Sequence, residues 1–281
     1  GRRVTAQLLH IPGEEYRDLP DWNWSTIKKA ERSVATMKAE RGVKSKPSPD
    51  MRFGSDVHSA ILEPGDMHSK VTPARPGLRR GTNEWKDLEK EAKAKGKRVI
   101  KHEDYTSIVD ILSKIRQHPE AWSLLFEAEG IAEGSILWDD PGSGLSLKAR
   151  IDRLLPSTAE GVPHLIDLKT DRDGSMESFS KRLVQYPFMY LHQLAFYRKA
   201  VLALTGEKAK CSFVVVEKSA AHPIRVFHML DSDLDLADAH IDTLLHAVRE
   251  YELFGVSPSE QHQSVILEAP SWWRLKQGAT S

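Results

Sequence analysis

Apolar and charged side chains alternate over residues 146–152, where Leu147, Ala149 and Ile151 are separated by charged residues. A repeat of two residues is typical of a strand that buries one face. A segment with proline, serine and glycine follows and predicts a turn, and the next short apolar stretch ends in charged residues. Another apolar stretch comes before the turn at 139–144. The pattern therefore predicts three consecutive strands, over 131–138, 145–155 and 164–169.

Elsewhere apolar residues recur at intervals of three and four, the spacing that buries one face of a helix. Ser25 is a suitable N-cap for the first of these segments. Two later apolar runs predict a hairpin of strands over 210–217 and 224–230. The predicted helices cover residues 26–40, 53–61, 83–95, 105–117, 121–126, 188–204 and 231–254, with a further short helix within 170–184.

The order of the central elements is helix, three strands, helix, strand, which indicates an α/β protein of αβββαβ order. Residues 1–21 show no regular pattern. We expect residues 1–50 to form a helical and irregular N-terminal extension, and residues 51–281 to form the main domain. The core of that domain is expected at about 105–230, followed by a C-terminal helix and tail.

Charge and composition limit the classes of function. The 40 basic and 40 acidic side chains of the 281-residue chain balance, which excludes a generally basic nucleic-acid coat but not an enzyme with a local basic groove. No apolar run approaches the roughly 20 residues that span a bilayer, and no signal-peptide pattern is present. The single cysteine, Cys211, excludes internal disulfides and a cysteine-based zinc site, and is expected to be a buried strand residue. We therefore expect a cytoplasmic protein without a membrane partner.

Candidate chemistry lies at the ends of two predicted strands. Asp152 ends one strand, Asp167 ends the next, and Lys169 follows two residues later. If these strands pair, both carboxylates meet at one edge of the sheet with an ammonium group beside them. Hard cations such as Mg²⁺ prefer that oxygen environment. Taken alone, an aspartate and a lysine two residues apart are common and more often form a surface ion pair, so other segments must support the interpretation.

Three other segments are candidates for the same site. His58 lies in a predicted helix and is either a partly buried packing residue or a metal ligand or phosphate contact. The segment 73–101 is strongly basic, and its helical part is typical of a solvated face with paired charges. The loop before that helix carries Arg79 and Arg80, which suit a DNA backbone. Gln193 and Tyr197 share one helix face and either pack with a polar tip or point into a site.

Together these segments resemble the PD-(D/E)xK nucleases. The pair Gly54 and His58 matches an upstream G-x-x-x-H pattern of the branch that includes the RecB-like nucleases. The closer resemblance is to nuclease domains of the exonuclease VIII (RecE) type and their phage relatives, over roughly residues 50–205. Ile151 stands where the family name has proline. The segments that carry the resemblance are 52–65, 132–138, 147–154, 165–170 and 190–197.

The resemblance implies an αβββαβ restriction-endonuclease-like fold and metal-dependent cleavage of DNA. It implies that Mg²⁺ or Mn²⁺ is held by Asp152, Asp167, the Leu168 carbonyl and His58. Lys169 would orient or deprotonate the attacking water and stabilise charge on the phosphate. Because histidine suits Mn²⁺ better than Mg²⁺, Mn²⁺ is expected to support activity well.

Other residues have a role and an alternative. Glu133 would ligate a second ion or help activate water, or is an ordinary strand-edge carboxylate. Gln193 and Tyr197 would line the DNA groove. Arg79, Arg80 and Arg150 would contact phosphates, although Arg150 is also a candidate for a structural ion pair.

The resemblance also implies a substrate and partners. We expect an exonuclease that degrades linear duplex DNA from its ends, in the 5′ to 3′ direction, in recombination or repair within a bacterium or phage-infected host. A ring-shaped homo-oligomer and a single-strand annealing protein are the expected partners. The alternatives are a catalytically inactive or structure-specific DNA-binding or endonuclease module on the same fold, and a protein with no nucleic-acid partner.

Overall fold

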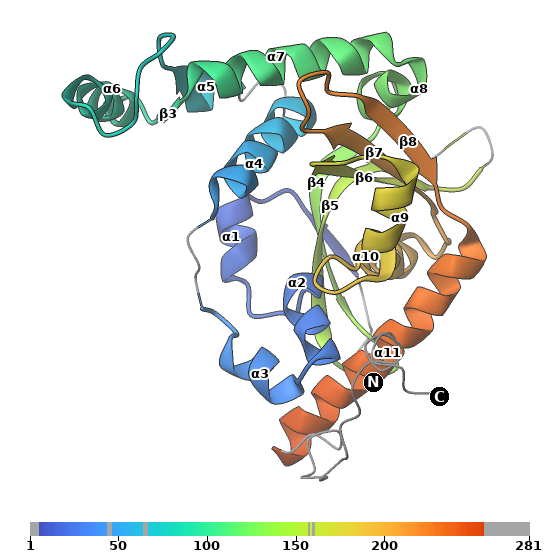
Figure 1. Cartoon of the computed structure of the whole chain (residues 1–281). Coiled ribbons are helices and arrows are strands. Elements are labelled where there is room, and N and C mark those ends of the chain that lie inside the picture. Colours follow the sequence, from blue (N-terminus) through green and yellow to red (C-terminus); the bar gives the residue numbers. More distant parts are fainter. Residues whose placement is uncertain (1–5, 44–46, 64–66, 157, 159–160, 256–281) are drawn as a thin grey trace, which may run out of the picture.

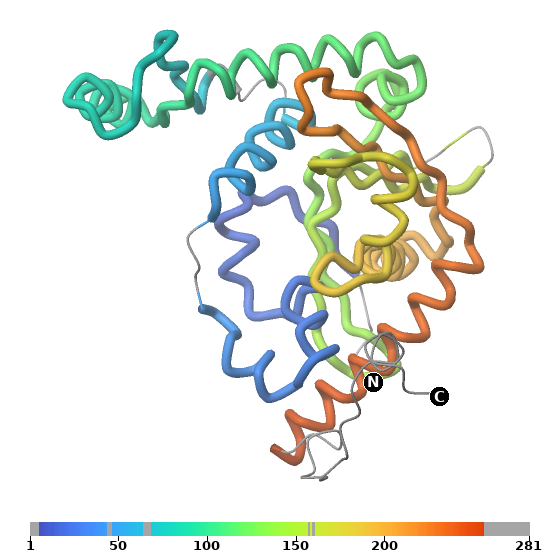
Figure 2. Tube along the Cα trace, viewed as in Figure 1, coloured from blue at the N-terminus to red at the C-terminus, as the bar shows by residue number. Residues whose placement is uncertain are grey.

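A twisted six-stranded sheet organises the protein (Figure 1). The computed structural model describes residues 6–43, 47–63, 67–156, 158 and 161–255, and Figure 2 traces their path. The strand order is β1-β4-β5-β6-β7-β8, in which only the β6–β7 pair is parallel. The strands are β1 (Gln7–Leu9), β4 (Ile131–Asp139), β5 (Ser146–Leu155), β6 (His164–Asp171), β7 (Lys210–Glu217) and β8 (Ile224–His228).

Helices flank this sheet and extend beyond it. Before β4 come α1 (Gly13–Asp18), α2 (Trp24–Ile27), the 3₁₀ helix η1 (Lys28–Glu31), α3 (Val34–Ala39), α4 (Pro49–Leu62), α5 (Met67–Lys70), α6 (Asn83–Ala94), α7 (His102–Gln117), α8 (Pro119–Trp122) and the π-helical turn η2 (Ser123–Glu127). After β6 come α9 (Met176–Val184), α10 (Tyr190–Thr205) and α11 (Asp231–Phe254). No helix among the described residues is long and apolar enough to cross a membrane.

Alternating side chains of the sheet fill two hydrophobic cores. On β7, Phe213 and Val215 face the core that includes α10 and α11, whereas Val214 and Val216 face the core that includes α4 and α7. A central strand that is apolar on both faces is expected when helices cover both sides. The predicted α/β class and αβββαβ order are therefore confirmed, and Cys211 is a buried residue of β7 as expected.

The N-terminal segment belongs to the first of these cores. Trp22, Trp24, Ile27 and Met37 are at most 5% exposed and lie in the same hydrophobic cluster as the sheet. Strand β1 and helix α1 form where the sequence shows no regular pattern, and β1 pairs with β4. The division into a 1–50 extension and a 51–281 main domain stays a prediction, and the expected C-terminal tail lies outside the described residues.

One predicted helix is wrong in its extent. A single helix was expected over residues 26–40 with Ser25 as its cap, but the segment folds as α2, η1 and α3. Asn23 caps α2 by accepting a hydrogen bond from the Thr26 amide, and Ser33 caps α3 by accepting one from the Thr36 amide. A capping side chain within the segment starts a new helix, and a continuous apolar stripe does not reveal that break.

Residues 67–101 form an arm that projects from the α7 end of the molecule (Figure 1). It contains α5, α6 and a two-stranded parallel sheet of β2 (Val71–Pro73) and β3 (Arg98–Ile100). Trp85, Ala92, Ala74 and Val99 form a small core within the arm. The arm thus has its own packing, although it is too small to be a second domain.

Candidate active site

Three carboxylates lie in one row across β4, β5 and β6. The pairing of β5 with β6 ends at Arg153 and Ile166, and the next positions in the same register are Asp152 and Asp167. The pairs on either side of Glu133 in the β4–β5 ladder place Glu133 opposite Asp152 in the same way. The register of three neighbouring strands therefore brings Glu133, Asp152 and Asp167 together.

The strands separate where these side chains lie. The backbone N–H of Leu168 donates to Asp152 Oδ2 at 2.7 Å, so the carboxylate occupies a position beside the backbone of β6. Glu133 has a positive φ of 52°, in the left-handed region that residues other than glycine rarely adopt. This conformation costs about 1–2 kcal/mol. Local strain of this kind concentrates at functional sites, where the surrounding structure holds the side chain in place.

Helix α4 adds an imidazole to the row. His58 Nδ1 lies 3.7 Å from Asp152 Oδ2. Ligand atoms of His58, Glu133 and Asp152 all lie within 4.8 Å of one another, so three elements supply one group of donors. Two carboxylates and an imidazole fit a divalent cation such as Mn²⁺ or Mg²⁺, with the imidazole favouring Mn²⁺.

Gly54 explains how His58 reaches the sheet. The two residues are one turn apart on α4, and a Cβ at position 54 would lie 2.8 Å from Thr170 Oγ1 on β6. Ordinary Cβ contacts do not come so close. The absence of a side chain therefore lets α4 approach β6, and this gives the G-x-x-x-H pattern a structural reason.

Lys169, which is partly buried, and Asp167, which is fully buried, form an ion pair beside this group. The Lys169 ammonium contacts Asp167 Oδ2 and lies 5.1 Å from the centre of the Tyr190 ring. Burial disfavours the charged ammonium, but the carboxylates of Asp167 and Asp152 outweigh that effect and raise the pKa of Lys169. Lys169 is therefore a cation at neutral pH.

Burial controls the protonation of the other groups. In the metal-free protein, burial raises the pKa of Asp152 to about 7 and that of Asp167 to about 6, while Lys169 opposes both shifts. Burial also lowers the pKa of His58 to about 4, with the Lys169 charge adding to the effect. His58 is thus a neutral imidazole near pH 7, the form that ligates metals. Metal sites commonly contain carboxyl groups whose pKa is raised when no cation is bound, because the cation stabilises their ionised form.

Arg150 and the α10 residues surround this centre. Arg150 donates through Nε to Glu133 Oε2 at 2.5 Å and through Nη1 to the Ile11 carbonyl at 2.8 Å. It therefore fixes the Glu133 carboxylate, as a structural ion pair would. Gln193 Nε2 donates to Tyr197 Oη at 2.7 Å. Burial raises the pKa of Tyr197, and the nearby Asp167 and Asp152 carboxylates add to this, so α10 lies close to the acidic row.

Arg79 and Arg80 lie apart from the centre, on the loop that precedes α6 in the arm. The Arg80 guanidinium lies 5.5 Å from the centre of the Trp85 ring. A contact of these arginines with DNA would therefore lie beyond the reacting phosphate.

The structure also reveals residues that the sequence patterns did not single out. A cavity of about 740 Å³ opens beside His58 and Lys169. Arg182 and Phe188 line it and lie 5.5 Å apart, measured from the guanidinium carbon to the ring centre. Arg182 falls in the short helix predicted within 170–184, and Phe188 falls at the start of the helix predicted over 188–204. Neither position carries a pattern that distinguishes it from the packing residues around it. The other lining residues are Asp50, Met51, Gly54, Thr170, Asp171, Arg172, Tyr190 and Lys218.

Comparison with known families decides what this fold is. The family model described as "PDDEXK-like domain of unknown function (DUF3799)" matches residues 23–260. The chain belongs to this PDDEXK-like family. The match spans strands β4 to β8 and every candidate residue named above, and it confirms the superfamily resemblance expected from the sequence.

A solved structure has a similar fold. A crystal structure named "Putative exonuclease" from Eubacterium rectale superposes with a TM-score of 0.59 and 17% sequence identity. The superposition covers 96% of this chain and 99% of that chain, so it supports the fold along the full length. A structure named SSO0001 aligns over 74% of this chain and 96% of that chain, with 15% identity and a TM-score of 0.27 that carries no argument. No curated protein is significantly similar in sequence.

Proposed function

We propose that the protein is a divalent-metal-dependent deoxyribonuclease that removes nucleotides from the ends of linear duplex DNA. The observation that carries the proposal is the row of Glu133, Asp152 and Asp167, with His58 on one side and Lys169 on the other. The PDDEXK-like family and its fold support a nuclease. The sequence also allowed a surface ion pair or simple helix packing for these residues. Neither alternative explains why three buried or half-buried carboxylates lie in one place.

The residues divide into those that hold the cation and those that act on the phosphate. His58, Glu133 and Asp152 would hold the cation, and Asp167 would hold Lys169 while lying close enough to share in binding. A cation bound there would offset the phosphate charge and lower the pKa of the attacking water. Water would attack phosphorus as the bond from phosphorus to the leaving oxygen breaks. The attacking water would lose one proton to solvent, and the leaving oxygen would take one up from solvent.

Lys169 would stabilise the charge that develops on the phosphate oxygens. Because its neighbours raise its pKa, the ammonium keeps its proton at neutral pH, which favours electrostatic stabilisation over a role as general base. Arg150 would hold Glu133 in its strained conformation and so act as a positioning residue. A direct contact between Arg150 and phosphate is compatible with this position but is not needed for it.

Several finer features belong to the proposal. Action at duplex ends, a 5′ to 3′ direction, a role in recombination, a ring-shaped assembly and an annealing partner all come from the resemblance to RecE-type nucleases. The name of the Eubacterium rectale structure is in keeping with action at ends. We propose Mn²⁺ or Mg²⁺ as the cofactor, with Mn²⁺ effective because His58 is in the donor group.

The test compares linear duplex with covalently closed circles of the same sequence, each incubated with Mg²⁺ or Mn²⁺. We expect the linear form to disappear and the circle to persist. Degradation of the circle at the same rate would replace the exonuclease with an endonuclease. A 5′ label and a 3′ label on parallel substrates give the direction, since release of the 5′ label first is expected.

A further inference from the structure

Charge is distributed unevenly in this neutral molecule. Residues 73–101, which lie mostly in the arm, carry ten basic and four acidic side chains, whereas α11 (residues 231–254) carries seven acidic and one basic. The arm and α11 lie at opposite ends of the molecule (Figure 1). A polyanion is therefore attracted towards the arm and repelled from α11.

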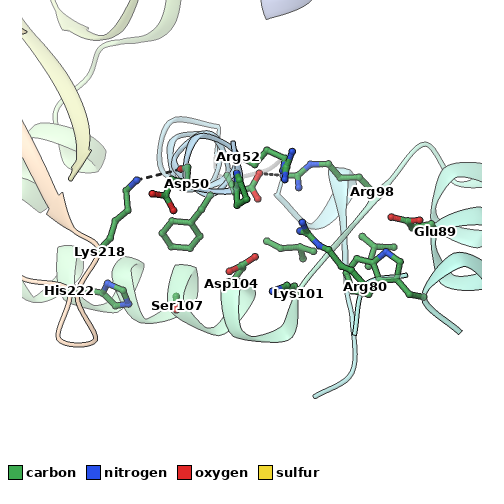
Figure 3. Close-up of a pocket in the computed structure, with 16 residues that line it drawn as sticks. Asp50, Arg52, Arg80, Glu89, Arg98, Lys101, Asp104, Ser107, Lys218 and His222 are labelled. Atoms are coloured by element: carbon green, nitrogen blue, oxygen red, sulfur yellow. Dashed lines mark hydrogen bonds and ion pairs between the residues drawn. The ribbon is translucent and has the colours of Figure 1, made fainter. Parts of the chain in front are cut away.

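A series of hollows leads from the reaction centre towards the arm. The cavity beside His58 and Lys169 shares Asp50 and Lys218 with a second cavity of about 620 Å³. The second cavity lies between α4, α7, the turn after β7 and the arm (Figure 3). It shares Arg80 and Lys101 with a third hollow of about 330 Å³ at the loop before α6, which Arg79 also lines. Each junction thus carries at least one cation.

The acids in this groove are partly neutralised. Asp56 forms an ion pair with Arg98, and Asp50 forms one with Arg172 at 2.6 Å. Glu89 and Asp104 also line the second cavity, facing the cations Arg52, Arg80, Lys101 and Lys218. Once these ion pairs are set aside, cationic side chains outnumber acidic ones in the lining of the second cavity, between α4 and the arm.

We infer that this groove, from the cavity at Lys169 past Lys218 and Lys101 to Arg79 and Arg80, holds the phosphate backbone of the duplex beyond the scissile end. The inference rests on the proposed nuclease function and adds the route of the substrate. Phosphates spaced along a backbone suit cations placed at successive junctions of a groove. Such contacts would keep DNA on a chain whose net charge is zero.

The test measures duplex binding in EDTA at several salt concentrations, so that no cleavage occurs. The variant is Arg80→Ala/Lys101→Ala, and the matched control is Lys90→Ala/Lys93→Ala, which removes two exposed cations of α6 that line none of these hollows. With a duplex of about 30 base pairs, the groove variant should lower the slope of log affinity against log salt by about 1.8, the value for two lost phosphate contacts. The control should keep the wild-type slope.

An unchanged slope for the groove variant, or an equal change in the control, would overturn the inference. Lys101→Arg should restore the slope if charge is what matters, and thermal melting checks that both variants fold.

This test is independent of the proposed activity. The groove variant could lower the slope of log affinity against log salt in a protein that never cleaves DNA. That result would support the DNA path along the groove and reject the nuclease activity. Metal-dependent cleavage of DNA by a groove variant whose salt slope is unchanged would support the nuclease and reject the route.

Discussion

Lys169 is the residue whose role follows most directly from its surroundings. Its ammonium is held by Asp167 and stays charged at neutral pH. Lys169→Met keeps the length of the side chain but removes the charge, so we expect turnover to fall by about 10²–10³-fold, as for loss of one electrostatic contact in a transition state. Calorimetric titration should show that Mn²⁺ still binds.

Asp152→Ala provides the contrast, because Asp152 belongs to the donor group itself. Its expected effect is weaker Mn²⁺ binding as well as lost cleavage, and Asp167→Ala should also weaken binding. If Lys169→Met abolished the Mn²⁺ heat while Asp152→Ala kept it, the division of roles would be reversed.

The raised pKa values predict how metal binding depends on pH. Asp152 and Asp167 ionise at about pH 7 and about pH 6 in the metal-free protein, so protons compete with the cation below these values. We expect Mn²⁺ affinity to fall by about tenfold per pH unit as pH drops from 7 to 6, and more steeply below 6. Titration calorimetry at several pH values measures this directly, and equal affinity at pH 5.5 and pH 8 would contradict it.

The same shifts predict the sign of a stability effect. Both pKa values lie above the ordinary value of 3.8, so these two carboxyl groups bind more protons in the folded metal-free protein than in the unfolded chain between about pH 4 and pH 7. The lowered pKa of His58 acts in the opposite direction between about pH 4 and pH 6.5, but it is one group against two. The free energy of unfolding should therefore decrease as pH rises from about 4 to 7. Added Mn²⁺ should raise the melting temperature more at pH 8 than at pH 5.5.

At the scale of elements, the approach of α4 to β6 decides whether His58 can act. Gly54→Ala places a methyl group against Thr170 Oγ1 and should displace the helix. The crowding costs about 1–3 kcal/mol, and the better helix propensity of alanine offsets about 1 kcal/mol. We therefore expect cleavage and Mn²⁺ affinity to fall more than the free energy of unfolding.

A double variant isolates that contact. Thr170→Ala removes the atom that a Cβ at position 54 would meet, so Gly54→Ala/Thr170→Ala should recover Mn²⁺ affinity relative to Gly54→Ala alone. No recovery would mean that Gly54 matters for another reason than its distance from β6.

The elements show what the sequence could and could not predict. Strand β5 and helix α7 have periodic patterns, β4, β6 and α10 are mainly apolar runs, and the structure confirms all five elements. The broken helix at α2–α3 depends on two local caps, and β1 depends on pairing with β4, which lies over 120 residues away. Long-range pairing of a short strand leaves no local periodic signal.

The candidate site was predictable in part for the same reason. Asp152, Asp167 and Lys169 could be singled out from the charged positions of predicted strands, although they lie within β5 and β6 and not at the strand ends that the sequence suggested. The placement of Glu133 depends on its left-handed backbone and on the β4–β5 register. Arg182 lies on α9 and Phe188 lies between α9 and α10, and only the folded chain brings them beside Lys169.

At the scale of the whole molecule, the N-terminal segment is part of the main core. Trp24 is 3% exposed and contacts the rings of His192 and Phe196 on α10. Trp24→Ala should lower the free energy of unfolding by about 3–5 kcal/mol. Val43, which is 70% exposed, provides the control, since Val43→Ala should change it by less than about 0.5 kcal/mol. Similar small effects for both in chemical denaturation would make the first 50 residues a separable extension.

The proposal that joins all three scales is that the carboxylate row holds a cation needed to cleave DNA. Its most direct test is nucleotide release from an end-labelled linear duplex, with EDTA and then with excess Mn²⁺, by the wild type and by Asp152→Asn. We expect no release in EDTA, release by the wild type once Mn²⁺ is added, and release at least about 100-fold slower by Asp152→Asn. Release in EDTA, or an Asp152→Asn rate equal to that of the wild type, would contradict the proposal.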